Sequence, residues 1–471
     1  MKKTNKFVRH VISAVVAQGF SLLQSLFMTF VVAKILSNSV FSWWQWFLYL
    51  AGLTHYIHIG VGEGILLKTG GTAYKKLDYD RFGGVFWKYA SLQAIACVGI
   101  IGFSVIRYAG SADGICIVLA ALFMVASNLS YFLSQLLIAT NRTSDYSKAV
   151  VINKTIMLIA SLCLLLGGYR NYIWFAVMYC VGQYCELLLC CRECKEVVWC
   201  RKKRQQSYYL REMLDDAKAG IVLSVSTLLA NLVSNIGRAC VKVINGLLDF
   251  GALSMANSLC SFFLMFIRQV GVVLFPFLRN ADYDKRKRLF VLSNQAICLI
   301  TLGILCFYYP VRFLLEQWLP SYRESFAYLV YIMPVVVLDS QMSVLNTPYL
   351  NAMRKEKRLL LINLTAFLVT LVVTLISIGI FNSMELVALS ITVGMVVKSL
   401  IGTISISKSY EVQMGQITRT ICFELALLVV FVLTARNNTI WSWLVYLGSY
   451  VGYCCFNRKD ILSVAKFKRM M

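Results

Sequence analysis

The sequence predicts an all-α polytopic membrane protein with about 14 transmembrane helices. Hydrophobic residues make up 59% of the 471 residues and charged residues only 14%, whereas a soluble chain is nearer half apolar and a quarter charged. One globule of this length cannot bury so much apolar surface, so lipid must cover the rest. The apolar runs are continuous, which argues against a β-barrel. This composition excludes a cytosolic enzyme, a disordered protein and a nucleic-acid-binding domain.

Fourteen apolar runs approach or exceed the length of about 20 residues that crosses a bilayer. The first exceeds the hydrophobic region of a cleavable signal, and further runs follow it, so it is interpreted as the first membrane helix. In chain order the runs are 10–36, 40–66, 83–107, 113–139, 149–168, 171–191, 217–243, 248–278, 290–315, 325–352, 359–381, 385–407, 418–435 and 439–456.

The basic residues orient these spans. With the N-terminus in the cytoplasm, 36 of the 46 Lys and Arg fall on the cytoplasmic side, 7 on the outer side and 3 inside spans. This positive-inside bias predicts that both termini are cytoplasmic. It also explains the net charge of +24, because topology signals that face anionic lipid need no nucleic-acid partner. Membrane lipids are therefore the expected contact.

The chain repeats itself at a shift of 210 residues, where Ala149–Thr155 resembles Leu359–Thr365. Arg142 and a basic loop at 68–81 match later basic residues at about the same shift. We expect two related six-helix lobes of one orientation, which places their pseudo-two-fold axis along the membrane normal. All five Pro lie beyond position 275, so helix breaks should concentrate in the second lobe. The predicted divisions are a lobe at 1–194, a cytoplasmic linker at 195–216, a lobe at 217–410, and two additional helices with a basic cytoplasmic tail at 411–471.

Motifs for catalysis or metal binding are scarce. There is no Walker A sequence and no outer loop large enough for a catalytic domain, so neither an enzyme nor a cofactor is expected. His55 and His58 have a spacing that could bind metal, but no carboxylate or cysteine motif supports such a site. Cys191-x-x-Cys194 lacks a second pair at zinc spacing and is interpreted as reduced thiols.

Polar residues form a helical face on each of two consecutive spans. On the seventh span they recur at intervals of three or four and end in two cations; they are Ser224, Thr227, Asn231, Asn235, Arg238 and Lys242. The face on the eighth span comprises Ser254, Asn257, Ser261 and Arg268. For the hydroxyl and amide residues the alternative is helix packing, because Ser, Thr and Asn often join spans.

The cations inside spans are more informative, because a charge at membrane depth is unfavourable unless it faces water or a partner. We expect Arg238 and Arg268 to line an aqueous cavity, the alternative being a buried ion pair with Asp339. Lys398 lies about 20 Å into the twelfth span. It either faces the cavity or extends to the membrane surface.

Among the carboxylates, Asp339 is placed nearest to mid-membrane, between Pro334 and Pro348. It is the candidate either for pairing with a cavity cation or for binding a coupling proton. Glu63 is a second candidate for coupling or an ion pair. Glu63, Glu186 and Glu424 lie close to inner ends of spans, where headgroup water is within reach.

Three segments carry a resemblance to a known family: Gly237–Asn257, with a Gly-containing turn before a small-residue helix; Val273-Leu-Phe-Pro276, before a basic loop; and Leu350–Arg358, entering the eleventh span. In these segments and in its overall layout, the chain resembles the O-antigen and exopolysaccharide flippases of the multidrug/oligosaccharidyl-lipid/polysaccharide exporter superfamily. The resemblance implies two six-helix lobes around a central cavity, two further helices, and alternating access.

The resemblance also implies a substrate, an oligosaccharide on undecaprenyl diphosphate that crosses the bacterial inner membrane for surface polysaccharide biosynthesis. A polysaccharide polymerase and a chain-length regulator are candidate partners. A diphosphate needs cations that replace its hydration shell, and Arg can hold phosphate by two hydrogen bonds. The expected substrate-binding residues are Arg238, Lys242, Arg268, Lys398, Asn231 and Asn257. The alternatives are a cation-coupled multidrug exporter of the same superfamily, which would need buried carboxylates, and a peptidoglycan-precursor flippase.

The orientation predicts which positions a membrane-impermeant thiol reagent reaches from outside the cell. In a cysteine-free background, single cysteines that replace Ser111, Asn171 or Ser321 should be labelled in intact cells. A cysteine that replaces Gln205 should stay unlabelled until the cells are opened, because it lies in the predicted cytoplasmic linker. Labelling at position 205 in intact cells would reverse the orientation.

Overall fold

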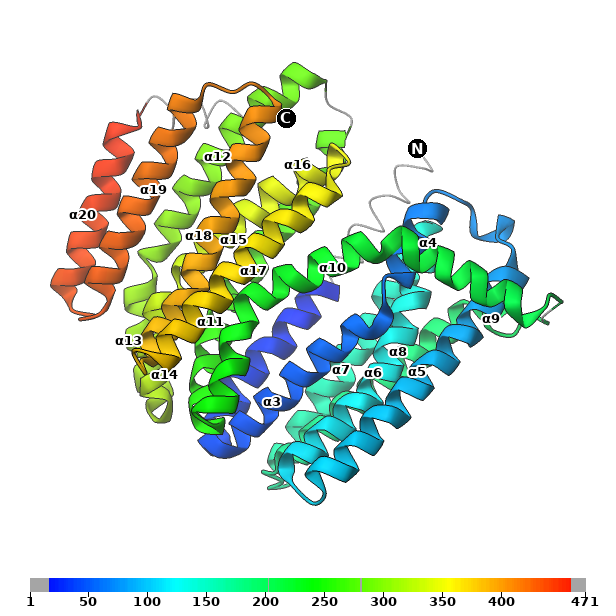
Figure 1. Cartoon of the computed structure of the whole chain (residues 1–471). Helices are drawn as coiled ribbons and strands as arrows, with labels where there is room; N and C mark the ends of the chain where they lie inside the picture. The colour runs from blue at the N-terminus through cyan, green and yellow to red at the C-terminus, as the bar shows by residue number, and fades with distance from the viewer. Residues whose placement is uncertain (1–16, 202, 280–281, 459–471) are drawn as a thin grey trace. The chain divides into compact units, whose positions relative to one another are not determined.

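The computed structural model describes residues 17–201, 203–279 and 282–458, apart from the side chains of residues 265, 266 and 268–279. Within these ranges the chain is helical and contains no β-strand (Figure 1). The predicted all-α polytopic fold is therefore confirmed. The two ends of the chain, with the predicted basic tail, lie outside the described residues.

The chain divides into two compact units, Met1–Leu228 and Leu229–Met471. The boundary falls inside the helix α10, Gln206–Ile244, which begins within the predicted linker. The division into lobes at 195–216 stays a prediction. Besides the first part of α10, the first unit contains the helical segment Ala17–Ile35, α3 (Asn38–Thr54), η2 (His55–His58), α4 (Val61–Thr69), η3 (Tyr74–Lys76), α5 (Tyr79–Tyr108), α6 (Ala112–Ala139), α7 (Thr143–Leu166), α8 (Tyr172–Glu193) and α9 (Lys195–Val198).

The second unit continues from α10 through a series of long helices and one interrupted region. Side-chain caps start several helices; for example, Ser383 Oγ accepts a hydrogen bond from the backbone N–H of Leu386 at the start of α18. The elements are α11 (Leu247–Arg279), α12 (Tyr283–Leu305), α13 (Tyr308–Trp318), η4 (Pro320–Tyr322), α14 (Arg323–Ile332), α15 (Pro334–Ser340), the π-helix η5 (Gln341–Asn346), α16 (Thr347–Ala352), α17 (Glu356–Gly379), α18 (Met384–Ser409), α19 (Met414–Ala435) and α20 (Ile440–Phe456).

All of the predicted spans contain helix in the part of the chain that the structure describes. Eleven of these helices are long and apolar enough to cross a membrane, and the bent pair Pro320–Ile332 and Pro334–Ala352 makes a twelfth if it is one span. The two predicted spans beyond this number correspond to α3 and α20, which are helical but only 17 residues long each. The predicted number of 14 is therefore approximate.

The second predicted span, 40–66, is interrupted. Between α3 and α4, Ile59 and Gly60 take left-handed φ values of 52° and 76°. A Cβ on Gly60 would lie 2.7 Å from the backbone nitrogen of Ile221, so a glycine permits both the turn and the close approach of α10. The sequence predicted helix breaks mainly in the second lobe, from the positions of proline. This break contains no proline, so the expectation based on proline positions did not identify it.

Two matching positions of the sequence repeat are buried in both copies, each within its own unit. Asn153 on α7 and Asn363 on α17 are both buried, as are Ala149 and Leu359 one turn earlier. Ala149 belongs to the hydrophobic core of the first unit and Leu359 to that of the second. In each case the repeated helix packs on the next one, α7 on α8 and α17 on α18.

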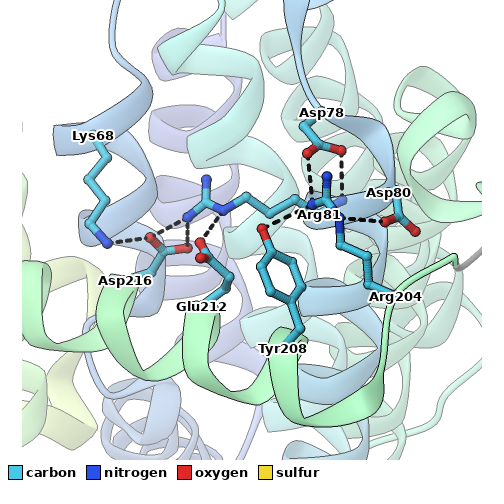
Figure 2. A network of polar contacts seen from close by, with 8 residues as sticks. All are labelled: Lys68, Asp78, Asp80, Arg81, Arg204, Tyr208, Glu212 and Asp216. Atoms are coloured by element: carbon cyan, nitrogen blue, oxygen red, sulfur yellow. Dashed lines mark hydrogen bonds and ion pairs between the residues drawn. The ribbon is translucent and has the colours of Figure 1, made fainter.

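Ion pairs hold the first part of α10 against α4 and α5 (Figure 2). The carboxylate of Asp216, which is 0% exposed, accepts hydrogen bonds from Arg81 Nη2 at 2.8 and 3.0 Å and from Lys68 Nζ at 2.9 Å. Arg81 Nε donates to Glu212 at 2.5 Å. A Cβ on Gly64 of α4 would lie 1.8 Å from the carbonyl oxygen of Asp216, so the two helices meet backbone to backbone here.

A second group of ion pairs forms where the chain enters α10 (Figure 2). The guanidinium of Arg204 contacts Asp78 at 2.8 Å and Asp80 at 3.5 Å. It also donates a hydrogen bond to the hydroxyl of Tyr208 at 2.9 Å. Most of this group is partly exposed, so we assign the main stabilising role to the pair of the buried Asp216 and the partly buried Arg81.

The substitution Asp216→Asn should destabilise the first unit by about 1–3 kcal/mol, because it removes the buried charge that accepts from both Arg81 and Lys68, although Arg81 keeps its contact with Glu212. The exposed neighbour Asp215, whose contact with Lys218 is 3.7 Å long, offers a matched control, and Asp215→Asn should cost at most about 1 kcal/mol. Thermal unfolding can be followed with a reagent that fluoresces on the buried thiols Cys190 and Cys194. Equal losses of stability in the two variants would contradict the assignment.

Candidate functional site

The second unit contains a polar cavity of about 360 Å³ between α10, α11, α15, η5 and α18. Its wall combines amides and hydroxyls with one acidic and one basic side chain. The polar and charged residues of this wall include Asn231, Asn235, Asn257, Asp339, Ser343 and Lys398.

Four residues that the sequence predicted for substrate binding or coupling lie in the wall of this one cavity. Asn231 and Asn257 reach it from α10 and α11, Asp339 from α15, and Lys398 from α18. Asp339 and Lys398 are only 6% and 5% exposed. The structure thus brings together residues that are far apart in sequence, and places a carboxylate and an ammonium group around one polar space.

Arg238 lies beside this cavity. It is 8% exposed and donates hydrogen bonds to Asn235 Oδ1, which belongs to the cavity wall, and to Ser254 Oγ at 3.3 Å. Lys242 follows one turn later, in the last turn of α10. Arg268 belongs to α11 by its backbone, and its side chain lies outside the described ones. Whether Arg268 faces a cavity therefore stays a prediction.

An irregular stretch of helix forms one side of the cavity. α14 and α15 meet at Pro334, where the span bends by 45°. The π-helix η5 follows, and α16 resumes with Pro348 in its first turn. Proline removes a backbone donor and π-turns widen a helix, so the helix is irregular where Asp339 and Ser343 line the cavity. The two prolines flanking Asp339 in the sequence were the signal for this break.

The expectation that Glu63, Glu186 and Glu424 reach headgroup water is wrong, because all three side chains are buried within the protein. Glu186 accepts a hydrogen bond from Asn153 Nδ2 at 2.6 Å. Glu424 accepts one from Gln341 Nε2 at 2.7 Å. Distance from a helix end does not reveal which face of the helix packs against protein, so sequence position alone was misleading.

Glu63 lies in the first unit, at the interrupted span. Its carboxylate accepts a hydrogen bond from Tyr131 Oη at 3.1 Å and lies 3.4 Å from His58 Nδ1. Because the same Nδ1 accepts from the backbone N–H of Gly60 at 3.1 Å, it carries no proton in this arrangement. In this arrangement the contact joins a neutral imidazole and a carboxyl group, and the coupling or ion-pair role of Glu63 stays a prediction.

Metal-binding geometry is not found among the described residues: no group of three or more His, Cys, Asp or Glu side chains converges on one point. The cysteines are free thiols. Just beyond the end of α8, burial raises the pKa of Cys194 to about 12, so this thiol stays protonated at neutral pH.

No family model and no curated protein matches the chain. Several solved structures are similar to it, however. A lipid II flippase, MurJ, in an inward closed conformation is similar with a TM-score of 0.67 over 96% of this chain and 100% of that chain, at 12% identity. A second similar structure is an inward-facing multidrug resistance transporter of the MATE family, which belongs to the multidrug/oligosaccharidyl-lipid/polysaccharide exporter (MOP) superfamily. Its TM-score is 0.63 over 86% of this chain and 98% of that chain, also at 12% identity.

A third similar structure is a MOP superfamily transporter from Pyrococcus furiosus, described as having a binding pocket of reverse polarity. Its TM-score is 0.52 over 86% of this chain and 95% of that chain, at 12% identity. At such identities the likeness shows the fold. This chain is a multi-pass membrane protein with the fold of MOP-superfamily flippases and transporters.

Proposed function

We propose that the protein is a flippase that translocates undecaprenyl-diphosphate-linked oligosaccharide repeat units across the bacterial inner membrane by alternating access. The observation that carries this proposal is the polar cavity of the second unit, with Lys398 in its wall and Arg238 beside it. Its volume of about 360 Å³ falls within the range of small-ligand sites, roughly 300–1,000 Å³.

The head group of such a lipid has two parts that match the wall of this cavity. The diphosphate needs cations that replace its hydration shell, a role that suits Lys398 and Arg238. The sugars need hydrogen-bond partners, which Asn231, Asn257 and Ser343 supply. The lipid tail can stay in the bilayer while the head group moves, so it adds little to the barrier.

The remaining parts of the proposal follow from the same substrate. Lys242 and Arg268 extend the set of cations along α10 and α11. Both termini are cytoplasmic, and the polysaccharide polymerase and chain-length regulator of surface polysaccharide biosynthesis are the proposed partners. The protein performs transport and no covalent chemistry.

Two alternatives each have an observation in their favour. The likeness to a lipid II flippase favours a peptidoglycan-precursor flippase, whose substrate is also a lipid. The likeness to a MATE family transporter and the carboxylate of Asp339 in the cavity favour a cation-coupled multidrug exporter. We prefer the anionic substrate because basic groups, Lys398 and Arg238, lie both in the cavity wall and beside it.

Removing a cation should weaken substrate binding, because a charge-assisted hydrogen bond to phosphate is lost. Arg238→Ala or Lys398→Ala should each reduce affinity by about 10- to 100-fold, and Arg238→Lys should recover part of the loss because it keeps the charge without the planar fork. Lys218, which is exposed on the first part of α10, gives the control variant Lys218→Ala.

The assay is translocation of a lipid-diphosphate-linked oligosaccharide in reconstituted vesicles, with the folding of each variant verified. Full transport by a folded variant that combines Arg238→Ala and Lys398→Ala would contradict the proposal of an anion-binding cavity. It would instead favour the cation-coupled exporter.

Asp339 is the proposed coupling residue of the cavity, with Glu63 as a second candidate in the first unit. If Asp339 binds the coupling proton, Asp339→Asn should transport at the same rate with and without a proton gradient, because the amide cannot ionise. The exposed Asp284, in the first turn of α12, gives the control Asp284→Asn, which should respond to the gradient like the original protein. If the original protein itself ignores the gradient, the coupling role of Asp339 is wrong.

A further inference from the structure

A second carboxylate lies just behind the wall of the cavity. Glu424 is the eleventh of the 22 residues of α19, so it sits about 15 Å from the start of the helix. It is 3% exposed. α19 is one of the two additional helices that the sequence repeat does not include, yet it brings a carboxylate to the side of the second unit that holds the cavity.

A short chain of hydrogen bonds joins Glu424 to the cavity wall. Gln341 Nε2 donates to Glu424 Oε2 at 2.7 Å, and Gln341 Oε1 accepts from Ser399 Oγ at 2.5 Å. Gln341 is the first residue of η5, and Ser399 directly follows Lys398. Both elements line the cavity through neighbouring residues. The carboxylate of Glu424 is therefore linked to the elements of the cavity wall through a single side chain, the amide of Gln341.

The second carboxylate oxygen of Glu424, Oε1, is buried and makes no hydrogen bond to any described residue. An ionised carboxylate at this depth would require more than the single donor that Gln341 provides. The neutral acid is the form that this environment accommodates best, because it needs fewer donors and carries no charge.

The groups that face Glu424 from the helices around it are neutral. Cys298 of α12 and Tyr453 of α20 lie close to it, and Tyr453 Oη donates to Cys298 Sγ at 3.7 Å. On α19 itself, Arg419 lies over the rings of Phe423 and Phe456, and Lys398 of α18 lines the cavity. The other charged residues of the packed helices lie near helix ends: Asp284, Lys285, Arg286, Lys287 and Arg288 on α12, Arg323 and Glu324 on α14, and Glu385 and Lys408 on α18.

We propose that Glu424 is a proton-binding site whose charge state controls the π-helical wall of the cavity. When Glu424 is neutral, Gln341 holds η5 as the structure shows it. When it ionises, the anion needs further donors, and the hydroxyl of Ser399, which now donates to Gln341, belongs to the same chain of hydrogen bonds. Loss of the hydrogen bond between Ser399 and Gln341 then frees η5 from its present position. A π-helical turn can convert to an α-helical turn, and this conversion rotates the residues that follow it. Ser343 is one of these residues.

This inference deepens the proposed function, and only its link to transport depends on that proposal. It assigns control of the proposed head-group site to α19, one of the two additional helices. Protonation of Glu424 would keep the wall in the arrangement that presents Asp339 and Ser343 to the cavity, and ionisation would change it. Proton binding and the movement of the wall can both be measured without any substrate.

Proton binding is tested with dicyclohexylcarbodiimide, which adds the O–H of a protonated buried carboxyl across its carbodiimide bond. The product rearranges to an N-acylurea that is located by peptide mass spectrometry. In the purified full-length protein, labelling of Glu424 should fall by about tenfold per pH unit once the pH exceeds the point of ionisation. Glu424→Gln should carry no label on this peptide. A folded protein with no adduct at Glu424 at any pH, or with a yield independent of pH, would overturn the proposal.

Movement of the wall is tested with Ser343→Cys in a cysteine-free background, as the reporter of thiol labelling rate. Thiolate formation alone makes the rate rise with pH, and we expect a further change in rate, superimposed on that rise, over the range in which Glu424 loses carbodiimide reactivity. Adding Glu424→Gln, which keeps an oxygen to accept from Gln341, should remove that change. Adding Asp339→Asn should preserve it, which separates this site from the coupling role proposed for Asp339. The same pH response with and without Glu424→Gln would overturn control of the wall by Glu424.

Discussion

A charged side chain in the apolar depth of a bilayer must be taken up by a partner or a polar space, and this constraint explains where the charges of this chain lie. Lys398 and Asp339 line one polar cavity. Arg238 donates to Asn235 and Ser254. Outside the predicted spans the same need applies to a charge buried in protein, and Asp216 is paired with Arg81 and Lys68 in the first part of α10. These contacts lie in the cavity wall, beside it, and where the first part of α10 packs on α4 and α5.

The irregular helices follow from the same constraint. A broken span exposes backbone donors and acceptors that lipid cannot satisfy, so breaks occur where protein or a cavity surrounds them. The interruption before α4 lies against α10, where Gly60 and Ile221 approach each other closely. The bend at Pro334 and the π-helix η5 form the wall of the cavity. Both breaks bring acidic residues, Glu63 and Asp339, into the interior of a unit. A bent or widened helix can change its register with little movement elsewhere, so these are the elements we expect to move.

The sequence predicted the helical segments well, because lipid exposure leaves long apolar runs that need no tertiary information. From helical periodicity and the energetic penalty of buried charge, it also selected Asn231, Asn257 and Lys398 for substrate binding and Asp339 for coupling or an ion pair, and these four residues line one cavity. It missed the break at Gly60, which depends on contact with α10 and contains no proline. It placed Glu424 at the membrane surface because the helix start was set at 418 rather than at Met414, and because burial depends on packing that apolar periodicity does not encode. The π-helix has no compositional signal of its own.

The central claim is that the cavity of the second unit receives the diphosphate and first sugars of a lipid-linked oligosaccharide. Photocrosslinking tests it most directly, with such a lipid carrying a diazirine beside the diphosphate, in vesicles that contain the purified protein. The account predicts adducts on the peptides of α10, α11, η5 and α18 that line the cavity. An excess of unlabelled lipid diphosphate should abolish them, and a cationic drug should not. Adducts that avoid these peptides, or that a cationic drug displaces while the lipid diphosphate does not, would contradict it.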